Sequence, residues 1–174
     1  AGAPRQMFSS IVDGTAHVLD FAAHCGADQL YLSSGAVYGR QPAGLERIPE
    51  TWTGGPDPLD PGSAYAEGKR AAECLCAITA QVPTKIARCF AFLGPHLPLD
   101  AHFAAGNFLR DALRSQPIVI EGDGRPLRSY LHPADLVVWL LAILVRGTPQ
   151  RAYNVGSEQA VSIAELAERI ARLA

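Results

Sequence analysis

The chain has 174 residues, of which 48% are hydrophobic and 18% are charged, so it is long enough to bury a core as one domain. Its formal net charge of −2 does not favour a polyanionic partner such as nucleic acid. The most apolar run, at 136–145, is too short to span a bilayer. We therefore expect a soluble cytoplasmic protein without a membrane partner.

Helix and strand patterns alternate along the chain. We expect helices at 7–25, 63–82, 102–114, 133–145 and 162–173, strands at 29–33, 84–90, 118–120 and 152–155, a long loop at 39–62 and a turn at 122–124. Gly26 is expected to end the first helix, while Ser63 and Ser162 are expected to cap two others. The apolar run at 136–145 predicts a buried helix. This alternation predicts an α/β fold with a parallel sheet.

A phenol and an ammonium group stand one helical turn apart, at Tyr65 and Lys69, and therefore share a face of the predicted helix. A free phenol has a pKa of about 10 and is a poor base at neutral pH, but a nearby cation favours the phenolate. A serine hydroxyl from Ser33 or Ser34, at the end of the preceding strand, could hydrogen-bond a substrate oxygen. These groups predict proton transfer at a carbinol or carbonyl oxygen. The alternative is a solvated helical pair without chemistry.

Further segments accompany the Ser, Tyr and Lys pattern in a fixed order. They lie at 11–15 (Ile-Val-Asp-Gly-Thr), 33–39, 65–69, 88–95, 122–135 and 153–156 (Tyr-Asn-Val-Gly). Together they resemble the NAD-dependent nucleotide-sugar epimerase/dehydratase family, in the extended branch of the short-chain dehydrogenase/reductase superfamily. The likeness extends over nearly the whole chain.

The resemblance implies a partial Rossmann-like parallel sheet with flanking helices, plus part of a small substrate-binding region. Residues 1–174 would then form a single partial domain. In it, 1–93 are the C-terminal part of the dinucleotide-binding fold, and 94–174 mix substrate-binding segments with late strands and helices of the core. The family's Gly-rich dinucleotide loop has no counterpart before Ser33. We therefore expect a truncated homologue or a fragment of a longer protein.

The resemblance also assigns roles to individual residues. Tyr65 is the base, Lys69 stabilises its phenolate, and Ser34 hydrogen-bonds the substrate oxygen. The cofactor NAD is contacted by Ser10, Ser33, Tyr65 and Lys69, and the nucleotide-diphosphate sugar by Asn107 and Arg128. No metal is expected, because the four cysteines lack C-x-x-C spacing. A homodimer through the helices at 7–25 and 63–82 is expected.

Two positions depart from the family pattern. Ser10 stands where many relatives have a cofactor-contacting Asn, and Ala91 takes the place of a substrate-contacting Asn. Residues 34–36 read Ser-Gly-Ala, whereas the family's 4,6-dehydratases have Thr-Asp-Glu there. This difference favours epimerisation or simple oxidoreduction over dehydration. The alternatives are a 4,6-dehydratase, a reductase of small ketones, and a non-catalytic fragment that only pairs with another chain.

Overall fold

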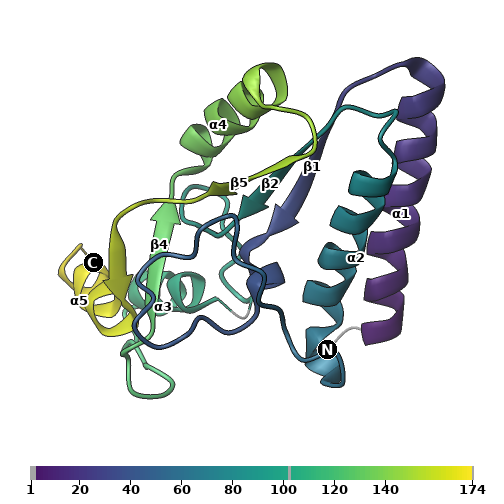
Figure 1. Cartoon of the computed structure of the whole chain (residues 1–174). Coiled ribbons are helices and arrows are strands. Elements are labelled where there is room, and N and C mark those ends of the chain that lie inside the picture. Colours follow the sequence, from purple (N-terminus) through teal and green to yellow (C-terminus); the bar gives the residue numbers. More distant parts are fainter. Residues whose placement is uncertain (1–2, 102, 174) are drawn as a thin grey trace. The chain divides into compact units, whose positions relative to one another are not determined.

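The computed structural model describes residues 3–101 and 103–173 (Figure 1). The chain divides into two compact units. Unit 1 holds the described residues up to Phe90 together with Val137–Val155, and unit 2 holds Ala91–Leu136 and the described residues from Gly156 onward. The chain therefore leaves unit 1 after Phe90 and returns to it at Val137.

Unit 1 is built on a three-stranded sheet in the order β1-β2-β5. Its strands are β1 (Gln29–Ser34), β2 (Thr84–Cys89) and β5 (Arg151–Val155). Both pairings are parallel, and the register places Ser33 beside Arg88 and Ser34 beside Cys89. The predicted parallel sheet is confirmed. In such sheets the carboxyl ends of the strands form the edge where ligands bind.

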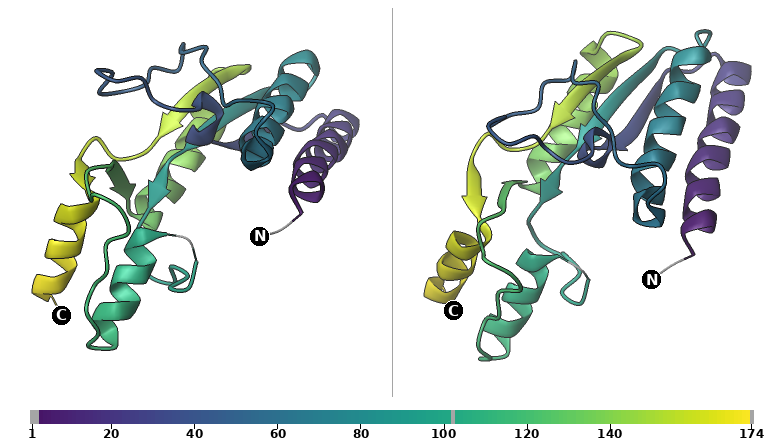
Figure 2. Two further views of the ribbon diagram at one scale, coloured as in Figure 1. Left: turned by 90° about the horizontal axis from the view of Figure 1, so that it is seen from below. Right: turned by 60° about the horizontal axis from the view of Figure 1, so that its bottom comes forward.

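Two helices, α1 (Pro4–Cys25) and α2 (Ala64–Ile78), pack side by side against this sheet (Figures 1 and 2). A cluster of buried side chains lies between these helices and the sheet: Leu19, Ala22, Tyr31, Ala72, Cys76, Val82 and Ile86. The helices approach closely at Gly68, where an added Cβ would lie 3.3 Å from Cδ1 of Ile11. Gly26 ends α1 as predicted, in a left-handed conformation with φ of 64°.

Helix α2 differs from its prediction at both ends. Ser63 stands at the N-cap position, but its side chain makes no capping hydrogen bond. Instead Asp60 caps the short 3₁₀ helix η2 (Pro61–Ser63), which leads directly into α2. The helix ends at Ile78 rather than at residue 82, because Thr79 leaves the helical conformation and its hydroxyl donates to the Leu75 carbonyl at 2.7 Å.

Helix α4 (Pro133–Arg146) matches its predicted position, but the prediction that it is buried is wrong. None of its described residues is buried, and five large apolar side chains are exposed: Val137, Val138, Trp139, Leu141 and Val145. Burial requires neighbours around the whole helix, and the described elements supply too few of them. Within the described ranges no helix has both the length and the apolar character needed to cross a membrane.

Unit 2 combines a small sheet with two helices. Strand β4 (Leu127–Leu131) pairs in parallel with β3 (Ala91–Phe92) and antiparallel with β6 (Ala160–Ser162). Helices α3 (Ala104–Leu113) and α5 (Ile163–Leu173) share an apolar cluster: Ala105, Phe108, Leu166, Ala167 and Ile170. The predicted cap of α5 is confirmed, since the Ser162 hydroxyl accepts from the Glu165 N–H at 3.1 Å.

The predicted strand at 118–120 is wrong. Its backbone pairs with none of the described strands of unit 2, although Ile118 and Ile120 pack against the cluster between α3 and α5. The apolar pattern therefore indicated contact with a core rather than membership of a sheet. Strand β4 was not predicted from the sequence, because neither of its partner strands, β3 and β6, was recognised there.

Candidate functional site

The two serines at the carboxyl end of β1 have different environments. Side chains alternate between the faces of a strand, so neighbouring residues point to opposite sides. Ser33 is 4% exposed and points toward α2, where its hydroxyl donates to Oε1 of Glu73 at 2.5 Å. Ser34 is half-buried and caps the 3₁₀ helix η1 (Gly35–Tyr38), since its Oγ accepts the N–H of Ala36 at 3.2 Å.

Tyr65 and Lys69 lie in the first turns of α2, and the structure brings their side chains together. The Nζ atom of Lys69 lies 5.9 Å from the centre of the Tyr65 ring and 5.1 Å from that of Tyr31. The same Nζ donates to the backbone carbonyl of Leu32 at 2.7 Å. Tyr65 is 41% exposed, so its phenol is accessible to a substrate. The ammonium group is therefore held between β1 and the phenol.

Partial burial changes the ionisation of Lys69. Desolvation lowers the pKa of its ammonium group below the ordinary 10.5, although the nearby Cys89 raises it in part. Burial likewise raises the pKa of the Cys89 thiol, although Lys69 lowers it in part. Burial disfavours the charged form of both groups. The Lys69 charge is therefore incompletely hydrated, which strengthens its action on neighbouring groups.

A buried ion pair beneath these residues was not predicted from the sequence. Arg88, on β2, donates from Nε to Oε1 of Glu73 at 3.0 Å and from Nη2 to Oε2 at 2.6 Å. The two side chains are only 15% and 13% exposed. Burial by itself lowers the pKa of Arg88, but the hydrogen bonds with Glu73 and Tyr38 outweigh it and raise that pKa. Arg88 therefore stays charged.

Further hydrogen bonds connect Arg88 of this ion pair with the long loop at 39–60. Arg88 donates from Nη1 to the Tyr38 hydroxyl at 2.9 Å and to the Glu50 carbonyl at 3.0 Å. The Tyr38 hydroxyl donates to Oδ1 of Asn154 at 2.6 Å, and Nδ2 of Asn154 donates to the Ile48 carbonyl at 2.8 Å. The segments that contain Tyr38, Arg88 and Asn154 were noted in the sequence, but nothing there showed that they meet.

A groove of about 370 Å³ runs beside β1 and α1 and is a candidate position for part of the cofactor. Ser10, predicted to contact NAD, and Lys69 both line it, together with Gln29. The Oε1 atom of Gln29 is buried, with no hydrogen-bond partner among the described residues. A hydroxyl and an ammonium group on the wall of the groove suit the hydroxyl groups of a ribose. The residues present therefore fit the nicotinamide-ribose half of a dinucleotide, whereas the sequence holds no Gly-rich loop for its pyrophosphate.

The two predicted substrate residues belong to unit 2. Arg128 is exposed on β4, and its Nη1 donates to the Leu127 carbonyl at 2.7 Å. Asn107 lies in α3, and its amide, in the orientation that satisfies its hydrogen bonds, donates to the carbonyls of Ala101 and Leu99 at 3.0 and 3.1 Å. The Asn107 amide group therefore holds the loop before α3, and the Arg128 guanidinium is accessible to solvent.

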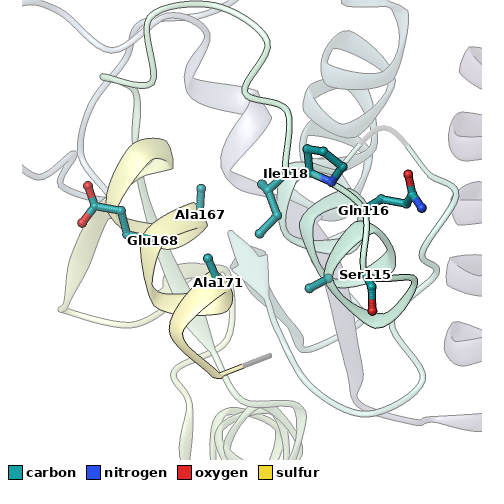
Figure 3. A pocket seen from close by; sticks show the side chains of 8 residues that line it. Ser115, Gln116, Ile118, Ala167, Glu168 and Ala171 are labelled. Carbon is teal, nitrogen blue, oxygen red and sulfur yellow. The ribbon is translucent and has the colours of Figure 1, made fainter.

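Unit 2 also contains an open cavity of about 590 Å³ between α3 and α5 (Figure 3). Figure 3 shows Ala167 and Ala171 of α5 on one side, with Ser115 and Ile118 opposite them. Small and apolar side chains dominate this lining, and none of the residues predicted to act on substrate or cofactor belongs to it. The cavity is therefore separate from the candidate residues of unit 2.

Comparisons with known proteins agree with the resemblance. Residues 1–156 match the family described as the NAD dependent epimerase/dehydratase family. UDP-glucuronic acid decarboxylase 4 of Arabidopsis thaliana is 34% identical over 168 residues, which cover 95% of this chain and 37% of the relative. UDP-glucuronic acid decarboxylase 1 of Xenopus tropicalis is 32% identical over 182 residues, covering 99% of this chain and 42% of the relative. The chain thus spans less than half the length of these relatives.

Solved structures show the same fold. RMD from Pseudomonas aeruginosa, complexed with NADPH, has a TM-score of 0.82 at 30% identity, covering 98% of this chain and 60% of that one. MoeE5, in complex with UDP-glucose and NAD, has a TM-score of 0.76 at 28% identity, covering 94% and 54%. The predicted fold is confirmed, as is the predicted enzyme family, which is described as NAD dependent. The chain belongs to the NAD-dependent epimerase/dehydratase family.

Proposed function

We propose that this chain carries the acid/base residues of an NAD-dependent enzyme that oxidises a carbinol of a nucleotide-diphosphate sugar. The observation that carries the proposal is the position of Lys69. Its Nζ is hydrogen-bonded to the Leu32 carbonyl and lies beside the ring of Tyr65. A structural lysine on a helix surface would instead point its charge into water.

The residues of this chain supply the proton chemistry. When bound, nicotinamide exchanges a hydride with the sugar carbon. Tyr65, with the Lys69 ammonium group beside its ring, accepts the proton of the sugar hydroxyl and can return it. Ser34, at the carboxyl end of β1, donates a hydrogen bond to the same sugar oxygen. Ser10 and Lys69 hold the ribose of the cofactor.

Recognition of the diphosphate is assigned to unit 2. Arg128 is exposed, and a guanidinium binds phosphate oxygens through two parallel hydrogen bonds. Asn107 supports this role by fixing the loop that precedes α3 through the carbonyls of Leu99 and Ala101. A structural neighbour at 28% identity is complexed with UDP-glucose, which supports a nucleotide sugar as the substrate class.

We favour an epimerase-type reaction among the family's outcomes. Dehydration requires an acid and a base beside the oxidised carbon, and Ser34, Gly35 and Ala36 provide neither. Decarboxylation is the second candidate, because the curated relatives are UDP-glucuronic acid decarboxylases. A ketone next to the carbon that bears a carboxylate already activates loss of CO2. Decarboxylation therefore also proceeds without an acidic side chain at position 36.

Substrate choice separates the two outcomes. The purified product of the complete gene that encodes this chain is incubated with NAD and either UDP-glucose or UDP-glucuronic acid, and the products are separated by anion exchange and weighed by mass spectrometry. An epimerase gives an isomer of unchanged mass, whereas a decarboxylase gives a product lighter by one CO2 from UDP-glucuronic acid. A product lighter by one water molecule would contradict our preference for epimerisation over dehydration. No turnover of any nucleotide sugar would contradict the proposed function.

We also propose a homodimer through α1 and α2. Phe8 and Phe21 of α1 are 38% and 68% exposed, and Ile78 at the end of α2 is 71% exposed. Exposed apolar side chains on two neighbouring helices favour an interface with a second copy of the chain. Light scattering should show a dimer for the gene product, and Phe21→Asp should shift it toward the monomer.

A further inference from the structure

Two side-chain hydrogen bonds, made by residues one helical turn apart on α2, join this helix to β1. Lys69 donates to the carbonyl of Leu32 at 2.7 Å, and one helical turn later Glu73 accepts from the hydroxyl of Ser33 at 2.5 Å. Tyr65, Lys69 and Glu73 follow one another at intervals of four residues, so they lie along one side of α2. The side of the helix that presents the phenol is therefore the side that holds β1.

Glu73 is the residue in this arrangement that contacts two strands. Its carboxylate accepts from Ser33 of β1 and accepts two further hydrogen bonds from Arg88 of β2. Both members of the ion pair are largely buried, and a buried carboxylate with several strong donors has few alternative positions. The rotation of α2 about its axis is thus determined relative to β1 and β2 together.

We propose that Glu73, through Ser33 and Arg88, is a positioning residue that sets the rotation of α2, so that Tyr65 and Lys69 face the carboxyl end of β1 beside Ser34. This inference rests on the proposed function for the roles of Tyr65, Lys69 and Ser34. Neither the family match nor the names of the relatives assign any role to Glu73.

A positioning role and a stabilising role lead to different expectations. Ser33 directly precedes Ser34, so the hydrogen bond to Glu73 also fixes the strand end that carries the proposed substrate-binding hydroxyl. Loss of one hydrogen bond among several leaves the fold intact, because Arg88 still holds Glu73. A shift of about 1 Å in reacting groups, however, lowers a rate about 100-fold. The rate should therefore fall by far more than the stability.

The kinetic test uses Ser33→Ala in the purified gene product. We expect kcat to fall at least about tenfold, with KM for NAD and for the nucleotide sugar changed less than about threefold, and Ser33→Thr to restore kcat. Thr79→Ala is the matched control, since it removes a hydroxyl that donates to the Leu75 carbonyl at the other end of α2. It should lower the unfolding temperature similarly and leave kcat unchanged. If Ser33→Ala does not fold, Ser33→Cys replaces it, because a thiol is a weak donor.

A second measurement does not depend on activity. In the wild type, the nuclear Overhauser effect between the Lys69 ε-methylene and the Tyr31 ring reports how α2 lies against β1, because Nζ is 5.1 Å from that ring. Ser33→Ala should weaken this effect, whereas Ser33→Thr and Thr79→Ala should keep it.

Three outcomes would overturn the inference. They are an unchanged Lys69–Tyr31 effect in Ser33→Ala, a loss of kcat no larger than in Thr79→Ala, and a rise in KM for NAD alone, which would indicate that Ser33 contacts the cofactor directly. A wild type that turns over no nucleotide sugar would refute the proposed function. The Lys69–Tyr31 effect would then decide by itself whether the Ser33–Glu73 hydrogen bond positions α2.

Discussion

Lys69 and Leu32 are joined by a hydrogen bond of 2.7 Å between an ammonium group on α2 and a backbone carbonyl on β1. This contact places a positive charge at the carboxyl end of the sheet, beside the phenol of Tyr65. The neighbouring hydrogen bond from Ser33 to Glu73 and the buried ion pair to Arg88 hold the same helix and strand together. The helix that carries the candidate catalytic groups is therefore hydrogen-bonded to both β1 and β2.

Replacement of Tyr65 by Phe should lower turnover of a nucleotide sugar by about 10²–10⁴-fold, because it removes the proton acceptor. The unfolding temperature should stay near that of the wild type, since Tyr65 is 41% exposed. Steady-state kinetics and thermal unfolding check the two parts. Near-normal turnover in Tyr65→Phe would exclude this residue as the base.

Replacement of Lys69 by Met should abolish most activity while stability near neutral pH is retained, because the lost hydrogen bond is offset by relief of desolvation. The lowered pKa of Lys69 also predicts a pH effect. Between that pKa and about 10.5 the unfolded chain binds more protons than the native one, so the free energy of unfolding of the wild type rises with pH. Urea titrations across this alkaline window should show a weaker rise in Lys69→Met. An equal rise in both proteins would count against partial burial of the charge.

Replacement of Arg128 by Ala should weaken nucleotide-sugar binding by about 1.5–3 kcal/mol, the contribution of a hydrogen bond to a charged group. NAD binding should not change. Arg125→Ala is the matched control, because that side chain is 88% exposed and precedes β4. Isothermal titration with UDP-glucose separates the two variants. Equal losses in both would mean that only the general charge of the region matters.

The 174 residues should bind NAD weakly, with a dissociation constant above about 1 mM, or less than about 4 kcal/mol of binding free energy. The reason is that they hold no Gly-rich loop to receive the pyrophosphate at a helix N-terminus. Strand β1 pairs only with β2 among the described residues, and such an edge promotes self-association. Titration with NAD and light scattering test both points. Micromolar binding by a monodisperse monomer would contradict this prediction.

The cysteines should react with iodoacetamide in an order set by their burial. Burial raises the pKa of the Cys76 thiol to about 11, so at pH 8 this group is a neutral and inaccessible thiol. Cys25 and Cys74 are exposed and should be alkylated in the native protein. Mass spectrometry of peptides before and after addition of urea measures the order. Rapid native labelling of Cys76 would mean that the core between α1, α2 and the sheet opens readily.

Local features were predictable because they depend on residues close together in the chain. The end of α1 at Gly26 follows from the freedom of glycine to adopt positive φ, and the Ser162 cap of α5 from a hydroxyl three residues before Glu165. The four-residue spacing of Tyr65 and Lys69 likewise places both on one side of α2. The alternation of strands and helices was sufficient to predict the parallel sheet.

The extent of burial and the long-range contacts were decided only by the tertiary structure. The apolar composition of α4 predicted a buried helix, but burial depends on the elements around it, and its described residues are not buried. Ser33 and Glu73 are 40 positions apart, and no local pattern indicates that a strand serine faces a helix glutamate. That contact, and the Arg88 ion pair beside it, exist only because α2 docks on β1 and β2 at one rotation. The sequence by itself determined which groups are available for chemistry, and docking of the helix on the sheet decided which of them meet.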